Sequence, residues 1–234
     1  MIELWPAIDL INNESVRLTE GDYGTKEVMS RTPQEAIAFY NQFDQVKRIH
    51  IVDLMGALHQ KPAEEAFIKD LIQTSERPVE IGGGIRKQET IDYYLKNGAS
   101  YVIVGTRGLL DSEWLKKMAD LYPGKIYLGL DAKKDQIAVN GWTESVDRTI
   151  FDVAEETASL KLGGIIYTDI SKDGKMQGPN FELTKALVQA TPHSVTASGG
   201  IRSLEDMNQL EEAGVKAAIV GKAANTTTFW EGIN

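Results

Sequence analysis

VEIGGGIRKQETIDYYLKNGASYVIVGT, residues 79–106, is matched 116 residues later by VTASGGIRSLEDMNQLEEAGVKAAIVGK, residues 195–222. Aligned without a gap, the two stretches share ten identical residues, including the GGIR turns at 83–86 and 199–202. The same shift aligns Asp53 with Asp169, and a shift of about 122 aligns the strand end AID with GLD. The chain therefore consists of two related halves, approximately 1–116 and 117–234.

The arrangement of apolar segments predicts the fold. Short apolar, β-branched stretches alternate eight times with segments of helical periodicity, and their continuous apolar character is typical of parallel strands. This pattern predicts an α/β fold, a single-domain (β/α)8 TIM barrel over 1–234 built from two similar half-barrels, because such barrels need roughly 200–250 residues. An open, doubly wound sheet is the alternative, but only a closed ring places units four apart opposite each other. The expected strands are residues 4–9, 48–54, 78–82, 101–105, 125–131, 163–170, 194–198 and 217–221. The expected helices begin near residues 33, 63, 87, 111, 147, 180, 203 and 226. Residues 10–32 and 171–179 are expected to be irregular.

Composition and charge narrow the possible functions. The chain has no cysteine and only three histidines, so thiolate sites are excluded and we expect no metal centre. A net charge of −9 disfavours a nucleic-acid partner. No apolar run approaches the roughly 18 residues of a membrane span, and Glu3 is unlike the basic start of a signal peptide. We expect a cytoplasmic protein that contacts neither membrane nor nucleic acid.

The glycine turns predict two phosphate sites. A strand that ends in Gly-Gly lets backbone N–H groups approach an anion, and the next helix presents its positive N-terminal end. Barrels commonly bind phosphate after strands seven and eight, and the repeat offers an equivalent place after strands three and four. Two facing cradles predict a ligand with a phosphate at each end, whereas the alternative is that the glycines only form tight turns. The predicted residues are Gly83, Gly84, Gly105, Thr106, Gly199, Gly200, Gly221 and Lys222.

Two aspartates end strands at opposite sides of the expected ring. Asp9 and Asp131 follow the first and fifth strands, where barrels carry catalytic groups, so they would face each other between the phosphate sites. Capping of loop amides is the alternative for each. Strand alternation places Asp169 on the face opposite Thr168, and we interpret Asp169 as structural.

Asp53 is interpreted as structural on the same grounds as Asp169. We expect His50 to lie between sheet and helices as a hydrogen-bonded residue rather than to act in catalysis. Trp142 follows the fifth strand, where an aromatic ring either packs the loop or forms a stacking platform for a flat ring.

Taken together, these segments resemble the phosphoribosylformimino-aminoimidazole carboxamide ribotide isomerases of histidine biosynthesis. The resemblance runs in order over essentially the whole chain. It rests on PAIDL, VRLTEGDY, IHIVDLMGA, EIGGGIR, IVGT, LDAK with VNGW, IYTDISKDGKMQGPN, ASGGIR and IVGKAA. It implies a cofactor-free Amadori rearrangement of a bisphosphorylated ribosylamine to the ribulosylamine, and a monomer without an obligate protein partner.

The resemblance also implies catalytic roles. One acid protonates the furanose oxygen so that the ring opens to an iminium, and one base removes the C2 proton. Asp9 is implied as the base and Asp131 as the acid, with Thr168 assisting. Asp173 is an alternative acid, because its carboxyl would reach the site when its loop closes.

Two segments are candidate lids: 10–32, which carries Arg17 and Gly21, and 171–179, which carries Gly174. Arg17 and Arg86 are the cations expected beside the substrate. The loop after strand six reads DGK where the family often has DGT, so a hydroxyl contact to the ligand is replaced by Lys175 or lost.

Three alternatives stay open. The cyclase of imidazole glycerol phosphate synthesis has a similar barrel, paired phosphate sites and two aspartates, but uses a glutaminase partner and ammonia; PAIDL and DGKMQGPN favour the isomerase. An isomerase that also converts phosphoribosyl anthranilate is compatible with the sequence. A barrel that only binds a phosphorylated metabolite is the non-enzymatic alternative.

Overall fold

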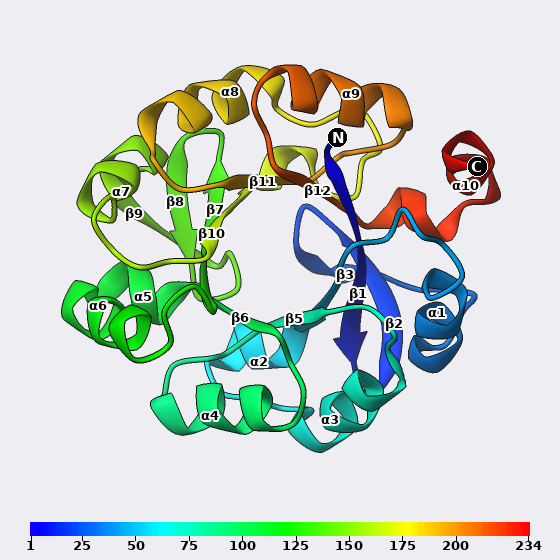
Figure 1. Cartoon of the computed structure of the whole chain (residues 1–234), viewed down its shortest axis with the longest axis horizontal. Coiled ribbons are helices and arrows are strands. Elements are labelled where there is room, and N and C mark those ends of the chain that lie inside the picture. Colours follow the sequence, from blue (N-terminus) through cyan, green and yellow to red (C-terminus); the bar gives the residue numbers. More distant parts are fainter.

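Eight parallel strands form a closed ring surrounded by helices in the computed structural model, which describes residues 1–234 (Figure 1). β10 pairs with β7, and β12 pairs with β1, so the ring has no open edge. The predicted (β/α)8 barrel is confirmed, each strand lying within two residues of its expected bounds. In ring order the strands are β1 (Glu3–Ile11), β4 (Ile49–Asp53), β5 (Val79–Gly82), β6 (Tyr101–Val104), β7 (Ile126–Lys133), β10 (Gly164–Asp169), β11 (Val195–Ser198) and β12 (Ala217–Val220).

The outer helices begin where the capping residues indicate. Thr32 and Glu35 form a reciprocal capping box at the first helix, and Ser203 caps a later one. Every expected helix starts within three residues of its predicted position, and none has the length and hydropathy that crossing a bilayer requires. They are α1 (Pro33–Tyr40), α3 (Glu65–Thr74), α4 (Gln88–Lys96), α6 (Ser112–Leu121), α7 (Ile150–Glu156), α8 (Phe181–Ala190), α9 (Leu204–Glu212) and α10 (Thr227–Ile233).

Two antiparallel hairpins were not expected. The prediction that 10–32 is irregular is wrong, because β2 (Glu14–Thr19) and β3 (Asp22–Val28) form a hairpin after β1. Asn12 and Asn13 adopt left-handed conformations that turn the chain back, so Asp9 pairs with Val16. A second hairpin, β8 (Gln136–Val139) and β9 (Glu144–Thr149), follows β7.

Strand alternation produces two apolar layers. One lies between the sheet and the helices, and a smaller one fills the ring interior with Trp5, Tyr127 and Ile166 among others. On β4, Ile49 and Ile51 pack toward the helices, so His50 between them points inward, level with Ala7 of β1. The expectation that His50 lies between sheet and helices is therefore wrong.

Short helices at matching places extend the internal repeat. α2 (Leu54–His59) and the 3₁₀ turn η1 (Ile170–Lys172) follow β4 and β10, and α5 (Thr106–Leu110) and η2 (Lys222–Asn225) follow β6 and β12. Asp53 caps α2 and accepts from three backbone N–H groups, including that of Ala63 at 2.7 Å. Asp169 caps η1 and accepts from Asn180 Nδ2 at 2.7 Å. Both aspartates are fully enclosed, which confirms their structural interpretation.

We expect Asp169→Ala to lower the free energy of unfolding at pH 7 by about 2–3 kcal/mol, because buried donors lose their acceptor. Burial alone would raise the pKa of Asp169, but hydrogen bonds from Asn180, Ser171 and the Lys134 N–H lower it below its ordinary value. The stabilisation is therefore present above about pH 4 and is lost as the pH falls through the lowered pKa. Urea unfolding at pH 7 and pH 3 measures this. If Asp169→Ala lowers the free energy of unfolding by the same amount at both pH values, this account is contradicted. Asp147→Ala, at an exposed position, is the control.

Candidate active site

A cavity lined by residues from every barrel strand or the loop that follows it lies at the carboxyl ends of the strands. Every sequence-predicted site residue except Arg86 lines it. Arg86 is exposed outside the lining, where its guanidinium donates to the carbonyl of Gln60 at 3.5 Å. The predicted residues that the structure brings together are Asp9, Arg17, Gly21, Gly83, Gly84, Gly105, Thr106, Asp131, Trp142, Thr168, Asp173, Gly174, Gly199, Gly200, Gly221 and Lys222.

The two GGIR turns have the same local construction. Gly83 and Gly199 have φ values of 108° and 95°, and a Cβ on them would lie 2.2 Å from the carbonyl oxygen of Asp53 and 3.0 Å from that of Asp169. Only glycine fits such close backbone contacts. The N–H groups of residues 83–85 and 199–201 make no hydrogen bond within the protein. Each turn thus offers unpaired donors to an anion at the cavity wall.

Cations are concentrated at the second cradle. The guanidinium of Arg17 packs against Gly221, and its buried Nε has no hydrogen-bond partner. Lys222 lies beside it and pairs with Glu27 of the hairpin at 3.6 Å. At the first cradle, by contrast, Thr106 Oγ1 accepts the Asn140 N–H at 2.8 Å. The two halves therefore repeat the backbone geometry but not the charge.

Three carboxyl groups share the centre of the cavity. Asp9 pairs with Arg17 at 2.7 Å between Oδ2 and Nη1. Burial raises the pKa of Asp131, although hydrogen bonds from Trp142 Nε1, at 2.6 Å, and from Thr168 oppose the shift. Thr168 faces the cavity while its neighbour Asp169 faces away, as strand alternation predicted.

Asp173 is the third carboxyl group of the cavity, and its pKa is also raised. Burial, together with the negative charges of Asp9 and Asp131, raises its pKa to about 7, and the cation of Arg17 opposes this only in part. Asp173 makes no side-chain hydrogen bond that would hold it in the charged form. A carboxylic acid with this pKa retains a proton near neutral pH and is suited to donate it.

The β2–β3 hairpin covers the cavity mouth. Tyr23 Oη donates to the carbonyl of Leu54 at 2.8 Å, and the Glu20 N–H donates to the carbonyl of Asp173 at 3.1 Å. Lys175 pairs with Glu20 at 3.3 Å and does not line the cavity, so it joins the two lid segments to each other. Both candidate lids are therefore in contact in this structure.

Trp142 supports the hairpin from the opposite side of the mouth. It follows Asn140 and Gly141, and all three adopt left-handed conformations with φ between 54° and 70°. Its indole lies under Gly21, where a Cβ would come within 2.0 Å of the ring. Trp142 thus packs the lid and donates to Asp131 at the same time.

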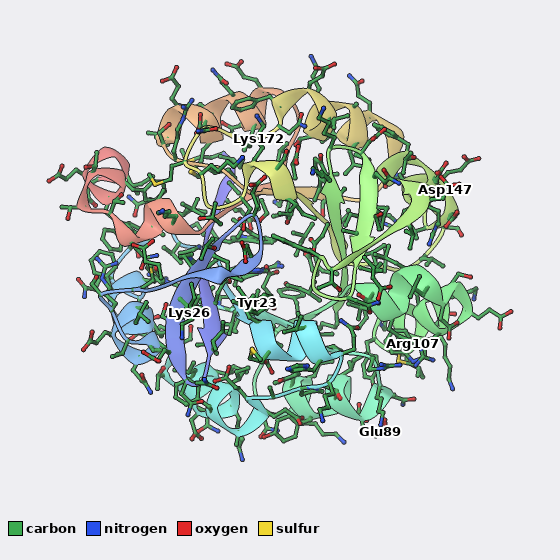
Figure 2. All side chains as sticks on the ribbon, turned by 180° about the vertical axis from the view of Figure 1, so that it is seen from behind. Tyr23, Lys26, Glu89, Arg107, Asp147 and Lys172 are labelled. Carbon is green, nitrogen blue, oxygen red and sulfur yellow. The ribbon has the colours of Figure 1, made fainter.

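Sequence reasoning missed Tyr23 and His50. Tyr23 lies near the centre of the ring in Figure 2, and its pKa is raised to about 12 by burial and by the charges of Asp9 and Asp53. Its place at the end of VRLTEGDY, six residues after Arg17 and within β3, was the available signal. His50 has a single available signal, its alternation with outward-facing Ile49 and Ile51.

The sequence matches the family model described as histidine biosynthesis protein over residues 3–229. The chain belongs to this family. The match includes all eight barrel strands and both hairpins. Members of the histidine biosynthesis family are barrel enzymes that include the isomerase and the cyclase, so the cavity at the carboxyl ends of the strands is the candidate active site.

We expect Gly21→Ala to prevent the hairpin from seating on Trp142, because the new Cβ would overlap the indole and φ is +71°. Trypsin should then cleave after exposed Lys26 several-fold faster. Gly24→Ala is the matched control, since its Cβ would meet only Asp22 of the same hairpin. Equal cleavage rates for the two variants would contradict this description of the lid.

Proposed function

We propose that this enzyme is the isomerase of the histidine biosynthesis family. It converts phosphoribosylformimino-aminoimidazole carboxamide ribotide, an N-linked ribosylamine with two phosphates, to the matching ribulosylamine by an Amadori rearrangement. The observation that carries the proposal is the carboxyl group of Asp173, whose pKa is raised to about 7 by burial and neighbouring negative charges, in the same cavity as the ion-paired Asp9. The reaction requires one acid and one base of this kind.

The substrate shape fits the two cradles. Unpaired N–H groups at residues 83–85 and 199–201 directly follow β5 and β11, which are four places apart in the ring, so they approach a ligand from opposite sides. A phosphate at each end of the ligand would satisfy both sets. The sugar bonded to nitrogen would then lie between them, beside the three carboxyl groups.

The acid and base roles follow from the contacts of each carboxyl group. Asp9 is paired with Arg17 and is the base that takes the C2 proton. Asp173 protonates the ring oxygen, because it carries a proton near neutral pH and has no side-chain hydrogen bond. Asp131, held by Trp142 and Thr168, orients the substrate and its iminium. The two protons gained, at the ring oxygen and at C1, balance the two protons lost, from C2 and from its hydroxyl group, as the C2 carbonyl of the ketose forms.

The ring interior argues against the cyclase. Ammonia from a glutaminase partner would need a path to the reacting atoms, and the layer beneath the cavity is filled by Trp5, Tyr127 and Arg48. Trp5 and Tyr127 meet edge to face with ring centroids 6.2 Å apart. A ring interior packed by these side chains favours the isomerase over the cyclase.

We expect the purified protein alone to convert the aminoaldose to the aminoketose, without ammonia or a second protein, as followed by ¹³C NMR of the sugar carbons. Asp9→Asn and Asp173→Asn should each lower kcat by about 10²–10⁴-fold, and Asp131→Asn by less. Conversion that persists in both of the first two variants would refute the roles. Phosphoribosyl anthranilate, assayed in parallel, tests the dual-specificity alternative.

The pH dependence follows from Asp173. The protonated fraction of this acid falls as the pH rises through about 7, so kcat should fall over the same range. The residual activity of Asp173→Asn should lack this fall, because asparagine does not titrate. A wild-type kcat that stays constant from pH 6 to pH 8.5 would contradict the assignment.

A further inference from the structure

His50 lies in the ring interior and lines the active-site cavity, with 12% of its side chain exposed. Its Nδ1 bonds Glu80 Oε1 at 2.6 Å. Its other nitrogen, Nε2, makes no hydrogen bond within the protein. His50 lies close enough to Asp131 for a charge on the imidazole to act on that carboxyl group. A ring nitrogen without a protein partner is therefore available beside the reacting centre.

Two charged residues beneath the cavity fix the imidazole. Glu80 is fully buried, and its second oxygen bonds Arg48 Nη1 at 2.8 Å. The guanidinium of Arg48 lies 3.8 Å from the ring centroids of both Trp5 and Tyr101, and its Nη2 donates to Tyr127 at 3.2 Å. Glu80 is thus held from below and can accept only from Nδ1–H of the histidine. When the ring carries a single proton, this arrangement places it on Nδ1 and presents Nε2 as a hydrogen-bond acceptor.

Stability alone does not require this arrangement. Replacing a buried ion pair with apolar side chains of similar volume is often neutral or stabilising, and the surrounding layer is otherwise apolar and aromatic. His50 is the only member of the His50, Glu80 and Arg48 chain that reaches the cavity. Glu80 and Arg48 therefore orient Nε2 of His50 toward a bound ligand. Hydrogen-bond partners behind a metal-binding histidine orient its ring in the same way.

We propose that His50 is a substrate-binding residue whose Nε2 accepts a hydrogen bond from a hydroxyl of the reacting sugar, and that Glu80 and Arg48 are its positioning residues. The inference rests on the proposed isomerase function and adds to it a contact from the cavity floor. It explains why a buried carboxylate and guanidinium are placed under a sugar site.

Two variants distinguish the contact of Nε2 with the ligand from the hydrogen bond of Nδ1 with Glu80. His50→Asn keeps a donor for Glu80 but withdraws the group that faces the ligand, so we expect unchanged urea unfolding and about a tenfold loss of kcat/KM. His50→Gln reaches the cavity but loses the bond to Glu80, so it should recover part of kcat/KM while unfolding at lower urea concentration. Wild-type kcat/KM in His50→Asn would overturn the proposal.

Imidazole NMR provides a readout that does not depend on turnover. The chain has only three histidines, so long-range ¹H–¹⁵N spectra resolve each ring. We expect His50 to show the Nδ1–H tautomer, and its Nε2 resonance to shift on addition of the ketose product while those of His59 and His193 stay fixed. An unmoved His50 resonance with bound product would overturn the contact even if isomerisation is observed. A shift without isomerisation would support the contact and refute the proposed function.

Discussion

Parallel pairing of β7 with β10 closes the ring, and the position of every functional group depends on that closure. Once the ring is closed, β1 lies four places from β7, and β5 lies four places from β11. Asp9 and Asp131 therefore face each other across one cavity, and so do the two GGIR turns. An open sheet with the same strands would spread these groups along one edge, four strand spacings of about 4.8 Å apart, rather than face to face.

The closed ring also determines the electrostatics of the site. Asp9, Asp131 and Asp173 share a cavity in which Arg17 is the only buried cation. Three ionised carboxyl groups in one buried cavity would repel one another, because little water is present to screen their charges. Protonation of Asp173 relieves that repulsion. The hairpin and the second lid keep this arrangement away from solvent. The same burial that is unfavourable for the folded state thus provides an acid that works near neutral pH.

The sequence was most informative where a local rule determines structure. Continuous apolar runs predicted the strands, and the glycine turns predicted the cradles, because positive φ and close backbone contact restrict residues 83 and 199 to glycine. The hairpin β2–β3 could not be predicted in this way, since β3 is almost entirely exposed and shows no alternation. His50 was assigned to the wrong face because the strand is covered on both sides, so its alternation with Ile49 and Ile51 does not show which face points inward.

The raised pKa of Asp173 was also beyond a reading of the sequence alone. It depends on charges from β1 and β7 and on a lid that arrives from another part of the chain. The position of the Arg86 side chain could not be predicted from its motif either. Arg86 directly follows the glycine turn, yet its side chain turns outward to Gln60. A motif fixes the backbone more strongly than it fixes the direction of a long side chain.

The most direct test is a crystal structure with the ketose product bound. One phosphate should lie against the N–H groups of residues 83–85 and the other against those of residues 199–201, with the rearranged carbons between Asp9 and Asp173. Both phosphates on one half of the barrel, or the reacting carbons remote from these two carboxyl groups, would contradict the central claim that each half-barrel binds one end of a single substrate.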